Sequence, residues 1–149
     1  MTVTRKVRLT IFCLLSVSLV VFIFSNSFQS PDESNAASGW VAAFLRPLLN
    51  PHGRLSDDVY HKLIRKLAHF TEFGMLGFCL GGVAANVLWR KKWFFAGAFA
   101  ILTAFADETI QSFTDRTNSI VDVTIDSAGA LCGLTAMAVI VWLIRKYKT

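Results

Sequence analysis

Four long apolar runs, separated by polar stretches, dominate the pattern of hydrophobic and polar positions along the chain. They cover residues 9–28, 67–88, 93–113 and 120–144. A helix that crosses the hydrocarbon core of a bilayer, about 30 Å thick, needs about 20 apolar residues at a rise of about 1.5 Å each. Each run is about that long, so the pattern predicts an all-α fold with four transmembrane helices.

The only long connection, residues 29–66, carries signals of its own. Residues 29–35 are polar and contain Pro31, which is typical of a turn. Ser56, followed by two aspartates, is typical of a helix start, so we expect the second span to begin there. Between them, apolar residues at helical spacing predict a short helix in the membrane interface; they are Trp40, Val41, Phe44, Leu45 and Leu48.

Together these elements predict a four-transmembrane-helix bundle with a short interfacial helix in the first outer loop, as a single domain over residues 1–149. Composition agrees, because 54% of the residues are hydrophobic, 17% are charged and the mean hydropathy is +0.50. A soluble domain carries about 25% charged residues. The odd number of cysteines, three, argues against a secreted disulfide scaffold.

The basic start and the serines at residues 25 and 27 also fit a cleaved signal peptide. The first run is long for a signal peptide and lacks an Ala-x-Ala type site, so we expect it to be retained as an anchor.

Basic residues are distributed unevenly among the polar segments. With both termini in the cytoplasm, the segments on that side carry no acidic residue and nine basic ones: Arg5, Lys6, Arg8, Arg90, Lys91, Lys92, Arg145, Lys146 and Lys148. Cytoplasmic loops are enriched in Lys and Arg, so we expect a multi-pass protein of the cell membrane with cytoplasmic termini. The net charge of +5 follows from this topology. We therefore expect contact with membrane lipids rather than with nucleic acid.

Ionisable residues lie at the outer ends of the last three runs, although a charge in hydrocarbon costs about 2.5–3.5 kcal/mol. Counting about 20 residues from the cytoplasmic ends puts His69 at the outer boundary, Glu72 about one turn deeper and Asp126 just inside. Asp107 falls roughly 9 Å below that boundary. Three helices thus bring ionisable groups to the outer third of the membrane, and their i,i+3 and i,i+4 spacings let each turn a polar face inward.

These residue types suggest an outward-facing binding or catalytic site. His69, with Glu72 or Glu108, is the candidate for proton transfer, because histidine titrates near neutrality. The candidates for substrate binding include two basic side chains that suit a phosphate group, Lys66 and Arg116. Four further candidates would orient these groups or a bound cation: Gln111, Asp107, Asp122 and Asp126. The alternative is structural, with ion pairs that tie the helix ends together.

Metal and nucleophile chemistry are weaker interpretations of the same residues. His69 with carboxylates from Glu72, Asp107, Glu108 and Asp126 offers a mixed set of ligands. However, the sequence has no HExxH motif, and only one of its three histidines falls in the cluster, so we expect no metal. A serine nucleophile is not favoured, because there is no GxSxG motif. The sequence identifies no cofactor, and it leaves open whether the protein is an enzyme.

Three motifs resemble the VanZ-like family. They are RKLAHFTEFGMLG at residues 65–77, ADETIQSFTDR at residues 106–116 and VDVTIDSAG at residues 121–129. The segment FSNSFQ at residues 24–29 is similar to the end of the family's first helix, which favours retaining that helix.

The resemblance implies a small bacterial membrane protein of a family named for an accessory protein that lowers susceptibility to the glycopeptide teicoplanin. The polar positions that recur in the family correspond to Lys66, His69, Glu72, Glu108, Gln111, Arg116, Asp122 and Asp126. At the last of these positions the family often has Asn, and this chain departs from it.

Our leading hypothesis is a role in the cell envelope, in which the polar cluster binds or modifies a lipid or a lipid-linked cell-wall intermediate and affects glycopeptide susceptibility. One alternative is a proton- or cation-coupled transporter, which would need a homo-oligomer because four helices enclose little space. Another is a non-catalytic membrane partner of a cell-wall enzyme, docked through Trp40 and Phe44.

Overall fold

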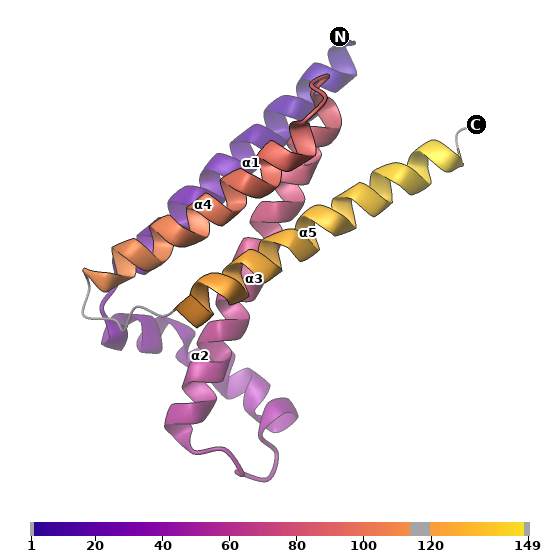
Figure 1. The fold of residues 1–149 in the computed structure, drawn as a ribbon. Helices are drawn as coiled ribbons and strands as arrows, with labels where there is room; N and C mark the ends of the chain where they lie inside the picture. Colours follow the sequence, from indigo (N-terminus) through magenta and orange to yellow (C-terminus); the bar gives the residue numbers. More distant parts are fainter. Residues whose placement is uncertain (1, 114–119, 148–149) are drawn as a thin grey trace.

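The computed structural model describes residues 2–113 and 120–147, which form five α-helices and no strand. Four of the helices are long and apolar enough to cross a membrane: α1 (Val3–Ser27), α3 (Asp57–Asn86), α4 (Lys92–Ser112) and α5 (Ile120–Lys146). The fifth, α2 (Pro31–Leu49), lies across one end of the bundle (Figure 1). The chain is therefore an all-α, multi-pass membrane protein, which confirms the predicted fold class.

Helix α3 is at the centre of the fold. It contacts each of the other four helices, and its contact with α5 is by far the most extensive. Two GxxxG pairs, Gly77 with Gly81 and Gly129 with Gly133, lie on these two helices. A Cβ atom on Gly133 would stand 1.9 Å from the carbonyl oxygen of Gly74, and one on Gly77 would stand 1.9 Å from that of Ala130. Glycine thus allows the two backbones to touch, as small residues do between transmembrane helices.

The apolar core fills the middle of the bundle. Helix α3 contributes large side chains, among them Phe73 and Leu76, which are fully buried. Helix α4 faces them with alanines at positions 96, 100 and 104, four residues apart and therefore on one side of the helix. Most of the surface of α1 and α5 is apolar and exposed, as expected for helices that face lipid.

Helix α2 is attached to the first turns of α3. The Tyr60 hydroxyl donates a hydrogen bond to the Ala42 carbonyl (2.7 Å), and the Arg46 guanidinium pairs with Asp57 (2.9 Å) and lies over the Tyr60 ring. Helix α3 begins at Asp57, as predicted, although the Ser56 side chain makes no capping hydrogen bond. These contacts place α2 across the end of the bundle that carries the predicted site.

One expectation about this segment is corrected. Residues 31–35 are the first turns of α2 and not a turn region, because Ser30 and Glu33 form a capping box with Pro31 at the start of the helix. The Ser30 amide and hydroxyl both donate to the Glu33 carboxylate (2.8 and 2.9 Å), and these hydrogen bonds lower the pKa of Glu33. The predicted apolar face is divided. Trp40, Phe44 and Leu48 are exposed, whereas Val41 and Leu45 pack against α3.

Candidate functional site

The polar residues predicted in three separate spans meet inside the bundle, near the end covered by α2. His69 comes from α3, Asp107 from α4 and Asp126 from α5. The Nδ1 atom of His69 lies 3.7 Å from Oδ2 of Asp107 and 3.6 Å from Oδ1 of Asp126. Both aspartates are 0% exposed. We call these three residues the His–Asp cluster.

Helices α1 and α4 hold one aspartate of this cluster in place. Gln111, one turn after Asp107 on α4, donates a hydrogen bond from Nε2 to Oδ2 of Asp107 (2.7 Å). From α1, the Ser27 hydroxyl donates a hydrogen bond to Oδ1 of the same carboxyl group. Both carboxyl oxygens of Asp107 therefore have partners, which fixes the orientation of the group.

The other aspartate is not supported in this way. Neither carboxyl oxygen of Asp126 has a hydrogen-bond partner among the described residues, and Nδ1 of His69 has none either. Buried polar atoms are almost always hydrogen-bonded in proteins, because leaving them unpaired forfeits their interaction with water. Within residues 2–113 and 120–147, the His–Asp cluster thus lacks a partner that would complete it.

The rim of the cluster carries both basic and acidic side chains. Lys66 of α3 forms a salt bridge with Asp122 of α5, and both side chains are partly exposed. A small cavity of about 10 Å³ lies between this pair and the His–Asp cluster. Its lining comes from α3, α4 and α5: Arg65, Lys66, His69, Glu108, Gln111, Asp122, Ile125 and Asp126. The cavity has room for about one water molecule, so a larger group could reach only its rim.

Eight of the nine predicted site residues lie in or next to this arrangement. Six line the small cavity, and Asp107 contacts His69 and Gln111. Glu72, partly buried on α3, accepts a hydrogen bond from Asn26 of α1 at 3.5 Å. Arg116 is outside the described residues. Which roles these residues have stays a prediction.

Sequence reasoning missed the contribution of α1. Asn26 and Ser27 reach Glu72 and Asp107, which are 46 and 80 residues away in the sequence. The available signal was the polar end of an otherwise apolar run, SNS at residues 25–27. That pattern was interpreted as the end of a helix, because nothing local shows which helix such a side chain faces.

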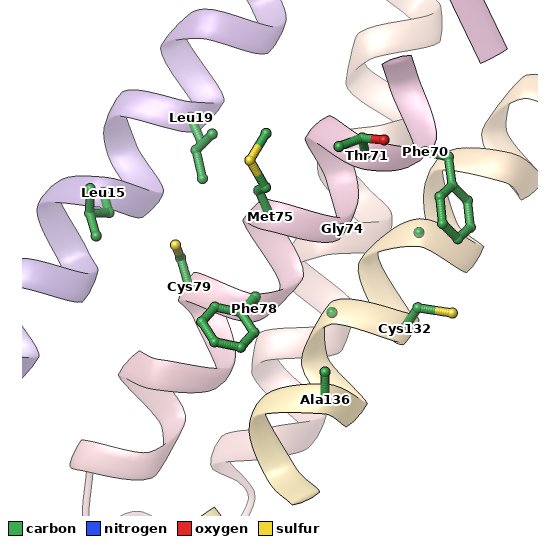
Figure 2. Close-up of a pocket in the computed structure, with 12 residues that line it drawn as sticks. Leu15, Leu19, Phe70, Thr71, Gly74, Met75, Phe78, Cys79, Cys132 and Ala136 are labelled. Carbon is green, nitrogen blue, oxygen red and sulfur yellow. The ribbon is translucent and has the colours of Figure 1, made fainter. Parts of the chain in front are cut away.

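An apolar groove of about 670 Å³ runs along another face of α3, between α1 and α5 (Figure 2). Leu15 and Leu19 line it on the α1 side, and Cys132 and Ala136 line it on the α5 side, together with the small residues Gly129 and Gly133. Its lining on α3 begins at Phe70, directly after His69, and continues to Cys79. The groove therefore starts at the depth of the polar site and extends toward the opposite end of the bundle.

Comparison with known proteins supports the resemblance of the motifs. The family model described as VanZ/LLP1 matches residues 12–144, which is nearly the whole chain and includes every helix that contributes to the site. Neither the curated proteins nor the solved structures include a match. The chain belongs to the VanZ/LLP1 family.

Proposed function

We propose that this VanZ/LLP1 protein binds an anionic lipid, or a lipid-linked cell-wall intermediate, on the side of the membrane that carries α2. One observation supports the proposal above all. On α3 the polar site, whose rim carries Arg65 and Lys66, extends as far as His69, and the apolar groove begins at the next residue, Phe70. A lipid has the matching pair of features, a charged headgroup and an apolar chain.

The headgroup would lie at the rim of the polar site. Lys66 and Arg65 are both partly exposed there, and fixed cations suit a phosphate group. The salt bridge to Asp122 leaves the Lys66 ammonium with further donors, since an ammonium carries three. Arg116 is predicted to add a second fixed charge.

The apolar chain would occupy the groove. Its lining is almost entirely apolar, with Thr71 as the one residue that carries a hydroxyl, and the Thr71 hydroxyl bonds the carbonyl of Leu67 on its own helix. Gly129 and Gly133 of α5 line the groove where they pack directly against the backbone of α3. A chain seated there would run parallel to the lipids around it.

In this proposal the site faces the cell exterior, and the protein acts on the envelope, with an effect on glycopeptide susceptibility. The positive-inside rule supports this orientation, as it places α2 outside. His69, Glu72 and Glu108 are the proposed proton-transfer groups if the bound lipid is also modified.

The test is to measure binding of a polyisoprenyl phosphate to the purified full-length protein in nanodiscs, with the corresponding polyisoprenol as the uncharged comparison. We expect the phosphate to bind more tightly than the alcohol. Lys66→Gln should weaken phosphate binding about tenfold, because one charge-assisted hydrogen bond is worth about 1.5–3 kcal/mol. It should leave binding of the alcohol unchanged.

The groove is tested by Ala136→Trp, which places an indole where the chain would lie. We expect this variant to weaken binding of the phosphate and of the alcohol alike. Thr135→Trp is the matched control, since Thr135 is exposed on the same helix and does not line the groove. Equal affinity for phosphate and alcohol, or identical binding by the two Trp variants, would contradict the proposal.

A further inference from the structure

We propose that His69, Asp107 and Asp126 bind one divalent transition-metal ion, Zn²⁺ or Mn²⁺, inside the bundle. One nitrogen or oxygen from each of the three residues lies within 4.8 Å of those of the other two. An imidazole with two carboxylates is a mixed donor set that suits both of these ions. The inference does not depend on lipid binding, because the ion site is inside the bundle and not at its rim.

The two distances from His69 are close to those of a metal site, and the three ligand atoms all lie within 4.8 Å of one another. Metal–ligand bonds of about 2.0–2.2 Å to imidazole and carboxylate place two tetrahedral ligands about 3.4 Å apart. Nδ1 of His69 is 3.7 Å from Asp107 and 3.6 Å from Asp126. These separations are too long for good hydrogen bonds and only slightly longer than those of a metal site. A small inward movement of the side chains would complete the coordination.

The unpaired atoms provide an independent reason. Asp126 is 0% exposed, and within the part of the chain that the structure describes both of its carboxyl oxygens, like Nδ1 of His69, lack a hydrogen-bond partner. The polar groups closest to Asp126 are the carboxyl group of Asp107 and the imidazole of His69. The ammonium of Lys66, which lines the same cavity, already forms a salt bridge with Asp122. A divalent ion would neutralise the two carboxylates and give each unpaired group a ligand bond.

The surroundings resemble the support that metal sites require. Ser27 and Gln111 orient Asp107 through hydrogen bonds, as residues behind metal ligands commonly do. The adjoining cavity of about 10 Å³ has room for one water molecule, which would be a fourth ligand beside the three side chains. With the ion bound, His69 acts as a ligand and not as a proton-transfer group.

The competing arrangement is a protonated His69 held between the two carboxylates with no metal. Elemental analysis separates the two. The full-length protein is purified in detergent without a metal-affinity tag, stripped with a chelator, and titrated with Zn²⁺, Mn²⁺ and, as an oxygen-preferring comparison, Mg²⁺. We expect about one Zn²⁺ or Mn²⁺ per chain after dialysis and a rise in thermal stability upon binding.

Asp126→Asn removes one charge from the site with little change in shape and should lower the affinity at least tenfold. Asp58→Asn, which removes an exposed carboxylate at the start of α3, should leave the affinity unchanged. X-ray absorption of the Zn²⁺-loaded protein provides a measurement that does not depend on the folding of a variant. It should show only nitrogen and oxygen ligands, with imidazole scattering.

Absence of stoichiometric binding, equal affinity in the two variants, or sulfur in the first shell would each overturn the inference. Lipid binding by the stripped protein is measured separately. Failure of the metal site therefore leaves the lipid proposal standing, and failure of lipid binding leaves the metal site standing.

Discussion

At the scale of single residues, the polar side chains within the bundle are supported by partners from other helices. Asp107 of α4 is bound by Ser27 of α1, and Glu72 of α3 is bound by Asn26 of α1. Such pairs offset part of the cost of placing a carboxyl group among apolar helices. Asp126 is the exception, because its support among the described residues consists only of His69 at 3.6 Å.

The prediction at this scale concerns the hydroxyl that sequence reasoning missed. Ser27→Ala should lower the free energy of unfolding by about 1–3 kcal/mol, because it removes a hydrogen-bond partner from a buried carboxyl group. Denaturation in mixed micelles measures the change. Ser25→Ala is the matched control, since Ser25 is exposed and its hydroxyl bonds only the carbonyl one turn earlier, at Val21. Equal losses in the two variants would show that the contact with Asp107 contributes nothing.

At the scale of elements, the contact of α3 with α5 determines where the two halves of the site lie. The glycines bring the two backbones close together where residues 70–78 of α3 meet residues 129–133 of α5. This close approach sets the depth at which Asp126 and Asp122 of α5 face His69 and Lys66 of α3. A change in the α3–α5 distance therefore changes the site even when no polar residue is altered.

Gly133→Ala tests this packing, because its Cβ atom would stand 1.9 Å from a backbone oxygen of α3. We expect a loss of about 1–3 kcal/mol in the free energy of unfolding, the usual cost of overpacking. Gly97→Ala, on α4, is the matched control. A Cβ atom there meets its nearest neighbour, a side-chain methyl group of Leu134, at 3.6 Å, an ordinary contact. A stability loss in Gly97→Ala as large as in Gly133→Ala would contradict the packing argument.

At the scale of the whole molecule, charge and polarity are divided between the two ends of the bundle. The start of α1, the turn between α3 and α4, and the end of α5 lie at the end opposite α2 (Figure 1). Arg5 donates a hydrogen bond from Nε to the carbonyl of Asn86 (2.8 Å), which joins two of these segments. Between the polar site and the end of the bundle opposite α2, the buried core is apolar, with Leu76, Leu80 and the alanines of α4. This core contains no chain of ionisable groups among the described residues, which disfavours the transporter hypothesis.

The prediction at this scale is the orientation in the membrane. In a variant whose three native cysteines are replaced by serine, His52→Cys should react with a membrane-impermeant maleimide on intact cells. Tyr147→Cys should react only after the membrane is opened. Both positions are exposed, and they lie at opposite ends of the bundle. The expectation follows from the positive-inside rule. The reverse labelling pattern would place the polar site in the cytoplasm.

The sequence by itself determined the four helices that are long and apolar enough to span a membrane and the positions of the ionisable groups along them. The reason is that hydropathy and a rise of about 1.5 Å per residue act locally along each helix. The ends of α4 agree with the predicted run to within one residue. The predicted start of α2 was wrong, although Ser30 and Glu33 form a recognisable capping box with Pro31 at the start of the helix. Polar composition was given more weight than the positions of these three residues.

Only the tertiary structure decided which groups meet. Helical spacing fixes how side chains are arranged around one helix, but not which neighbour each face contacts. The sequence thus grouped Lys66 with several acidic residues, and the fold paired it with Asp122. It likewise placed Ser27 at the end of α1, and the packing of α1 against α4 turned it toward Asp107. Close glycine contacts between α3 and α5 brought His69 and Asp126 together, and the packing of α4 against both helices added Asp107.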